Sequence, residues 1–390
     1  MKRNGRNFGA GILLAAGIVC VAFGLLRLIP VRDVLEYVIP MPQGTEAGEH
    51  TRELYAAVDQ VRDGMSDAAS ALSMAGVTEK LSLLVGDESV STMVYAVGEQ
   101  WFDVYPAQIE QGRTLMESEL LSGAKLAVID ESLAFKLYGE MLPDNATLEL
   151  AGEEYRVVGT ARFAHSVGAR SDHCVWVPLL SLMRQEESAA VLGSLSPDVL
   201  MLSALPVKDS GARGLFESAA CTQWQDGGSM YSLGKEAMRG TIILRAAIFL
   251  LGMGALFRLI PKMNGVTQRR MRSYRALLKE RYFPGTVPAL LRSIAVCILG
   301  YGALLMLAYG LLHFTFEPLY TFTEWVPDNI TSWTSLKKVF WNLIDEHAKL
   351  ISCGSVAMRE IEFYSGCVRW GAFTTLIGIV LFLWRGKRES

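Results

Sequence analysis

The sequence has 390 residues, 51% of them hydrophobic, and its formal net charge at pH 7 is −3. It contains no Walker A, HExxH or GxSxG motif, which argues against ATP hydrolysis, zinc-peptidase chemistry and serine-hydrolase chemistry in this chain. We therefore expect a protein that is not an enzyme, that binds no cofactor or metal and that has no nucleic-acid partner.

Four segments are apolar enough to cross a bilayer as helices, which takes about 20 residues each. The first lies in residues 1–30, the second in 241–261, the third in 293–316 and the fourth in 367–390. A cleaved signal peptide is the alternative for the first segment, but no small-residue cleavage site follows it. The segments contain no proton-relaying carboxylate, which argues against a secondary transporter.

Basic residues indicate how these spans are oriented. Lys and Arg gather in residues 1–6, 258–292 and 385–388, and such regions face the cytoplasm. Residues 31–240 instead carry 15 basic and 31 acidic residues. We expect a multi-pass protein of the cell membrane with both termini cytoplasmic and with residues 31–240 and 317–366 extracytoplasmic.

The outer region begins with a predicted helix from Thr51 to Gly76. Its apolar residues are spaced alternately by four and three, as on the contact face of a coiled coil: Leu54, Val58, Val61, Met65, Ala68 and Leu72. Such a helix packs on its own domain or pairs with a partner subunit. Strands are predicted after it at residues 81–85 and 91–97.

The next stretch has the clearest local patterns in the chain. A strand is predicted at 125–129, then a helix at 131–138 that Gly139 ends. Alternating residues predict a hairpin of strands 147–150 and 155–158 about Gly152, and a later strand at 175–177 that Pro178 ends.

This succession resembles the MacB-like periplasmic core domain over about 85 residues. In that family a Gly-Arg turn precedes a strand and helix of pattern VAVL…LA…LFG, then a hairpin and a strand that ends in Pro. The matching pieces here are Gly112-Arg113, Ala127-Val128-Ile129, Leu133-Ala134, Leu137-Tyr138-Gly139, Leu148–Gly152, Tyr155–Gly159 and Pro178, with Tyr95–Tyr105 similar to the strand and loop before the turn.

The rest of the outer region predicts a helix at 179–192, a strand at 199–203, a helix at 209–219 and a helical extension of the second span at 229–240. The fold class is therefore a membrane α-helical protein with four spans and a large extracytoplasmic α+β domain of two lobes.

A second outer loop, residues 317–366, contains Trp325, Trp333 and Trp341 and a predicted helix at 334–353. The resemblance implies only a short connection here, so this loop departs from the family. It is a lid, a membrane-surface helix or a partner site, and its aromatic residues fit anchors at a membrane interface.

The basic loop 262–292 contains the sequence QRRMRSYRALLKERYFP at residues 268–284. It resembles the FtsX-type permease segment of pattern RRREI-x-x-x-RALGA, a cytoplasmic helix that docks on a separate ATPase, but it lacks the family's acid and its LGA ending. The resemblance implies an ATPase-docking helix; the alternative is a positive-inside loop without a partner. The implied docking residues are Arg269, Arg270, Arg272, Arg275 and Leu277.

The resemblance as a whole implies a membrane subunit of a MacB/FtsX-type ABC transporter. A separate ABC ATPase would bind the ATP, a second permease copy or paralogue would complete a dimer, and the spans would contact the lipid bilayer. The subunit would transmit ATPase motion to the extracytoplasmic domain for export or mechanical work. The alternative function is a non-transporting signalling or scaffold protein that regulates an extracytoplasmic partner.

One polar cluster has residues of metal-ligand type, namely His165, Asp172, His173 and Cys174. We expect a polar loop there and no metal, because exposed loops of this kind are usually only polar. A disulfide between Cys353 and Cys367 is conceivable, but nothing in the sequence brings the two residues together.

Overall fold

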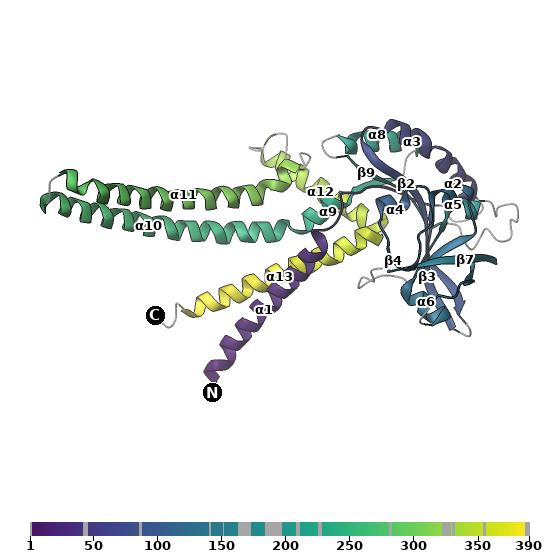
Figure 1. The fold of residues 1–390 in the computed structure, drawn as a ribbon, viewed down its shortest axis with the longest axis horizontal. Coiled ribbons are helices and arrows are strands. Elements are labelled where there is room, and N and C mark those ends of the chain that lie inside the picture. The colour runs from purple at the N-terminus through teal and green to yellow at the C-terminus, as the bar shows by residue number, and fades with distance from the viewer. Residues whose placement is uncertain are drawn as a thin grey trace. The chain divides into compact units, whose positions relative to one another are not determined.

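The computed structural model describes residues 2–41, 46–85, 88–139, 142–150, 152–162, 173–183, 197–207, 211–224, 228–280, 283–321, 329, 332–353 and 356–386. The chain forms two compact units. The helical unit comprises residues 1–28, 238–339 and 364–390, and the sheet unit comprises residues 29–237 and 340–363. Figure 1 shows the helices and strands of each.

Four helices among the described residues are long and apolar enough to cross a membrane, which confirms the four predicted spans. They are α1 (Lys2–Leu28), α10 (Ile242–Glu280), α11 (Phe283–Thr321) and α13 (Val356–Gly386). Large apolar side chains such as Leu26, Leu250 and Leu299 remain exposed on them, as expected of groups that contact lipid.

The second and third of these helices, α10 and α11, run side by side as a hairpin (Figure 1). Tyr301 donates a hydrogen bond to Asn264 Oδ1 at 2.7 Å across the pair, and Arg245 forms a 2.8 Å ion pair with Glu317. The basic residues that were predicted to form a loop with its own helix continue α10 without a break to Glu280. Arg, Lys, Leu and Met favour helix, so the segment simply extends the span.

Helices α1 and α13 pack closely through glycines. A Cβ added to Gly17 would lie 2.6 Å from Thr374 Oγ1, and one added to Gly371 would lie 2.8 Å from the carbonyl oxygen of Gly17. Small residues let two membrane helices approach closely, and at these two positions even the Cβ of alanine would be too near its neighbours. Cys367 on α13 is a free thiol, whereas the side chain of Cys353 lies outside the described residues.

The sheet unit contains ten strands among the described residues. Their order is β10 (Ser229–Ser232), β1 (Leu35–Pro40), β9 (Val199–Pro206), β2 (Ala69–Val85), β3 (Glu88–Val97), β8 (His173–Pro178), β5 (Leu126–Asp130), β7 (Glu153–Arg162) and β4 (Gln108–Gly112), with β6 (Thr147–Leu150) also on β7. The β3–β8 and β5–β7 pairs are parallel, and the other pairs are antiparallel. The two lobes expected from the sequence thus share one sheet.

Side chains alternate between the two faces of this sheet and build a core on each. On β3, Val94 and Ala96 join one core, whereas Met93, Tyr95 and Val97 join the other. The first core is covered by α3 (Val58–Gly64) and α8 (Ala212–Gln223), and α2 (Glu46–Ala56) precedes α3. The second includes Trp101 of α4 (Trp101–Val104) and Met358 of α13.

The predicted helix from Thr51 to Gly76 is wrong in its second half. Helix ends at Gly64, and β2 begins at Ala69. The six apolar residues that gave the helical spacing are nevertheless all buried in the first core. β2 pairs with both β9 and β3, and this tertiary pairing overrides a local spacing that fits either structure.

Two further predictions need adjustment. Residues 229–232 form the edge strand β10 instead of a helix, and α9 (Leu233–Gly240) begins only after them. The backbone of β10 pairs with β1, which no local pattern encodes. Of the helix predicted at 179–192, α7 (Leu179–Met183) is present, and residues 184–192 lie outside the described residues.

The predicted strand, helix and hairpin of the central stretch are confirmed as β5, α6 (Glu131–Tyr138), β6 and β7. The Gly-Arg turn before them ends β4, where Gly112 has a positive φ of 73°. Gly159 of β7 faces it so closely that an added Cβ would lie 2.8 Å from the Arg113 amide nitrogen. Both positions therefore require glycine.

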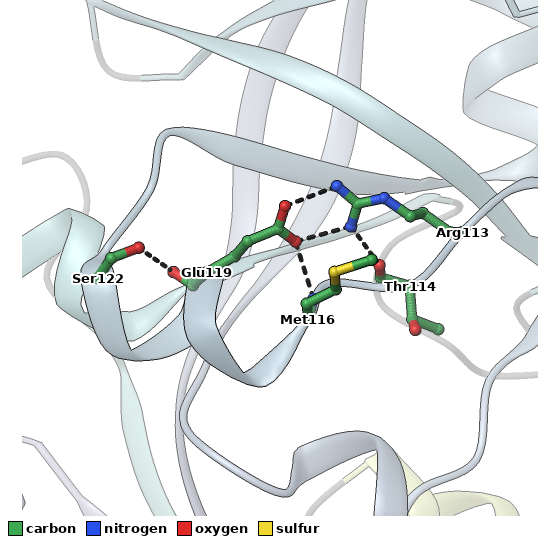
Figure 2. Close-up of polar contacts among 5 residues, drawn as sticks. All are labelled: Arg113, Thr114, Met116, Glu119 and Ser122. Atoms are coloured by element: carbon green, nitrogen blue, oxygen red, sulfur yellow. Dashed lines mark hydrogen bonds and ion pairs between the residues drawn. The ribbon is translucent and has the colours of Figure 1, made fainter.

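Arg113 then anchors the next helix, α5 (Glu117–Ser122). Figure 2 shows its guanidinium donating to both carboxylate oxygens of Glu119, at 2.7 and 2.6 Å. The same carboxylate accepts a 2.8 Å hydrogen bond from the Met116 amide at the start of the helix. The hydrogen bonds from Arg113 lower the pKa of Glu119.

Candidate partner-docking surface

The implied docking residues all lie on the last turns of α10, but the helix divides them between two sides. Arg269, Arg272 and Arg275 are exposed, whereas Arg270 and Leu277 are half-buried. At about 100° per residue, the three exposed arginines and Lys279 share one side. We call these four residues the basic face. No carboxylate in the described part of the chain pairs with the three arginines.

The half-buried side belongs to the contact between α10 and α11. Met263, Thr267, Arg270, Tyr274 and Leu277 follow one another at spacings of four and three, and each is half-buried. Thr267 donates a hydrogen bond to the Tyr301 hydroxyl of α11 at 3.4 Å. Leu277 thus continues the α10–α11 interface and is not brought together with the exposed arginines.

Two exposed apolar residues beside the basic face, Met271 and Leu278, were not among the implied docking residues. Met271 is 50% exposed and Leu278 is 40% exposed. They are seven residues apart, so they lie on one side of the helix, next to Arg275. The sequence pattern that could have predicted them is an apolar pair seven residues apart within a basic segment. The arrangement combines fixed positive charge with two apolar contacts, and it suits an acidic protein surface with a small apolar pocket.

The polar cluster considered for metal binding is only partly described, because His165 and Asp172 lie outside the described residues. His173 and Cys174 are both buried on β8. Burial raises the pKa of the Cys174 thiol well above its ordinary value, which disfavours the thiolate that metals bind. No group of three metal-ligating side chains occurs among the residues that the structure describes.

His173 instead contacts the first turn of α6. Ser132 Oγ lies 2.7 Å from His173 Nδ1, and Asp130 Oδ2 lies 3.6 Å from the same nitrogen. A Ser-His-Asp triad needs the hydroxyl and the acid on opposite ring nitrogens, so that the ring passes a proton between them. Here both groups face Nδ1. The trio therefore joins β8 to the start of α6 and does not form a nucleophilic site.

A pocket of about 700 Å³ lies where α6 meets β4 and β7. In its lining, Arg162 pairs with Glu110 at 2.9 Å and with Glu131 at 3.6 Å. The lining also contains Asp130 and Lys136, so it carries charges of both signs and gives no clear preference for an anionic or a cationic ligand. The basic face of α10 remains the surface best suited to a partner.

Comparison with known proteins agrees with this fold. The family model described as the MacB-like periplasmic core domain matches residues 11–204. The macrolide export ATP-binding/permease protein MacB 2 of Yersinia pestis bv. Antiqua is 28% identical over 257 residues, which cover 62% of this chain and 37% of that protein. The corresponding MacB of Mannheimia succiniciproducens is 25% identical over 115 residues, which cover 29% of this chain and 18% of that protein.

Two solved structures are similar at 15% identity over 51% of this chain, each with a TM-score of 0.37. One is the periplasmic region of MacB from Actinobacillus actinomycetemcomitans, of which 88% is covered. The other is the extracellular domain of the noncanonic ABC-type transporter YknZ from Gram-positive bacteria, of which 98% is covered.

The four apolar helices and the α+β sheet unit define a multi-pass membrane protein with a MacB-like core domain. Residues 11–204 form a MacB-like periplasmic core domain, and the chain is similar to the MacB/FtsX-like permeases. It spans less than two fifths of the length of the curated relatives described above.

Proposed function

We propose that this chain is the membrane subunit of a MacB-type ABC system, driven by an ABC ATPase that is a separate subunit and that binds the ATP. The basic face of α10, with Met271 and Leu278 beside it, carries the proposal. Guanidinium groups pair bidentately with carboxylates, and the apolar pair supplies anchors for a packed interface. In this proposal the basic face and both termini are cytoplasmic, and the sheet unit is extracytoplasmic.

The chain connections support transmission of motion from the spans to the sheet. α1 leads directly into β1, and β10 leads through α9 into α10. β1 and β10 are hydrogen-bonded neighbours, so the first two spans are attached to one end of the sheet. α13 is a third connection, since Met358 and Ile361 are buried in the sheet unit and the same helix continues as the fourth span.

The remaining parts of the proposal concern partners and output. A second permease copy or a paralogue completes a dimer, and the exposed apolar side chains of the spans contact lipid or that second copy. The relatives are named for macrolide export. For this chain we propose export of, or mechanical work on, an extracytoplasmic substrate.

Purification of the tagged full-length chain from gently solubilised membranes tests the docking. An ABC ATPase should be recovered, as identified by mass spectrometry and by ATP hydrolysis in the eluate. Charge reversal by Arg272→Glu with Arg275→Glu should lower recovery at least about tenfold, which corresponds to about 1.4 kcal/mol. Met271→Asp should act similarly, because a charge would enter the packed contact.

Matched variants separate protein docking from attraction to anionic lipid. Met271→Leu keeps the apolar contact and should retain the ATPase. Arg272→Lys with Arg275→Lys keeps the charge but loses bidentate pairing. The amount of co-purified ATPase should fall if the ATPase docks on the basic face. It should stay constant if the basic face binds only anionic lipid. If no ATPase accompanies the unaltered chain, the docking proposal is wrong and a scaffold or signalling function takes precedence.

A further inference from the structure

Helix α12 (Trp333–Cys353) connects the third and fourth apolar helices. It follows α11 after residues 322–332, and residues 354–355 separate it from α13. Two intervening residues place the end of α12 within about 11 Å of the start of α13. The chain itself therefore tethers α12 to α11 on one side and, on the other, to the start of α13, whose later part is the fourth apolar segment. Helix α12 is not among the four helices that are apolar enough to cross a bilayer.

One side of α12 exposes large apolar side chains. Trp333 is 79% exposed, Phe340 58%, Trp341 51% and Ile344 38%. At about 100° per residue, all four fall within an arc of about 100°. The exposed polar residue Asn342 lies on the opposite side, and the exposed Lys338 and Asp345 lie between it and the Trp341 edge of the arc. The helix is thus amphipathic, and within the described residues nothing covers its apolar arc.

The position of Lys337 within this arc favours a lipid surface over a protein as its cover. Lys337 is exposed near the middle of the apolar arc. In a protein–protein contact its ammonium would be buried among aromatic rings and would need a carboxylate partner. At a membrane surface its long stem lies along the apolar groups while the charge reaches the phosphate layer. Trp is also the residue most typical of that interfacial layer.

We propose that α12 is an interfacial helix, whose segment from Trp333 to Ile344 lies in the headgroup region of the bilayer with its aromatic arc toward the acyl chains. The ligand is the lipid surface itself, and the helix lies on the side of the membrane where α11 ends and α13 begins. The inference rests on the exposed arc, on the position of Lys337 within it and on the chain connections of α12 to α11 and α13, and it does not depend on ATPase docking.

Fluorescence quenching by brominated phosphatidylcholine tests this proposal on the full-length chain in nanodiscs that hold one copy each. Lipid brominated close to the headgroup should quench Trp333 and Trp341. The quenched signal of the unaltered protein should therefore exceed that of Trp333→Phe with Trp341→Phe, and the difference spectrum isolates these two residues from the other tryptophans.

A pair of charge variants completes the design. Phe340→Asp places a carboxylate in the apolar arc and should reduce quenching of Trp333 and Trp341 at least twofold. Asn342→Asp places the same charge on the polar side and should leave quenching unchanged. Circular dichroism shows whether each variant keeps its helix content. If brominated lipid quenches the unaltered protein no more than the double Phe variant, the arc faces water or a protein and the proposal is overturned.

Discussion

Glu119 shows at the scale of one residue how the Gly-Arg turn is fixed. Its carboxylate binds Arg113 through two hydrogen bonds and also accepts from the Met116 amide at the start of α5. One side chain thereby joins the end of β4 to the next helix (Figure 2). This explains why an arginine follows the glycine: Lys could not bind both carboxylate oxygens in a planar fork.

The pair predicts an acid-dependent loss of stability. The pKa of Glu119 is lowered from its ordinary value of 4.5, so its contribution is present above that value and is lost as pH falls through the folded pKa. Glu119→Gln should reduce the free energy of unfolding at pH 7 by about 1 kcal/mol, a modest value because Arg113 stays 40% exposed.

Denaturant unfolding, followed by tryptophan fluorescence at several pH values, measures this effect. The difference between the two proteins should disappear in acid. Glu117→Gln on the same helix turn is the matched control, because the Glu117 side chain makes no hydrogen bond or ion pair with the described residues, and it should have little effect. A gap of the same size at acidic pH would contradict the assignment to the ionised pair.

At the scale of elements, the antiparallel pairing of β4 with β7 depends on a close approach of their backbones at Gly112 and Gly159. Gly159→Ala should destabilise the protein by about 3 kcal/mol, because the new Cβ meets the Arg113 backbone and the two strands must separate. Gly214→Ala on α8 is the control, since nothing lies within 4 Å of its Cβ position. Thermal unfolding of both variants checks the prediction, and equal melting temperatures would refute it.

The elements that the sequence predicted well are those with strong local signals. β5, α6 and the β6–β7 hairpin have apolar runs, a terminating Gly139 and a turn at Gly152 with a φ of 81°. The first half of β2 and all of β10 were missed because they depend on strand partners distant in the chain, β9 and β1. A spacing of four and three at Leu54–Leu72 could not reveal that pairing.

The docking surface shows the same division between local and distant information. The exposed arginines follow from the helical spacing of one segment, so their common side was predictable. The position of Leu277 depends on which side of α10 meets α11, and this depends on contacts such as Tyr301 with Asn264. Those contacts lie on another helix, and no pattern within residues 268–284 specifies them.

At the scale of the whole molecule, the proposed orientation can be tested by fusion. A reporter that is active only outside the membrane should work after Gly152 and after Asn329. It should fail after Arg272 and after Ser390, because positive charge retains those regions in the cytoplasm. Activity measured at equal expression of each fusion decides the matter. An active reporter at Arg272 would refute the four-span orientation.

The glycine contact between α1 and α13 has a consequence for biosynthesis. It joins residues near position 17 with residues near position 375, whereas the partners in the α10–α11 hairpin are neighbours in the chain. At a translation rate of about 5–20 residues per second, α1 waits roughly 20–70 s in the membrane before its partner is made. Throughout that time its glycine face contacts lipid or other helices, so the α1–α13 contact can form only at the end of synthesis.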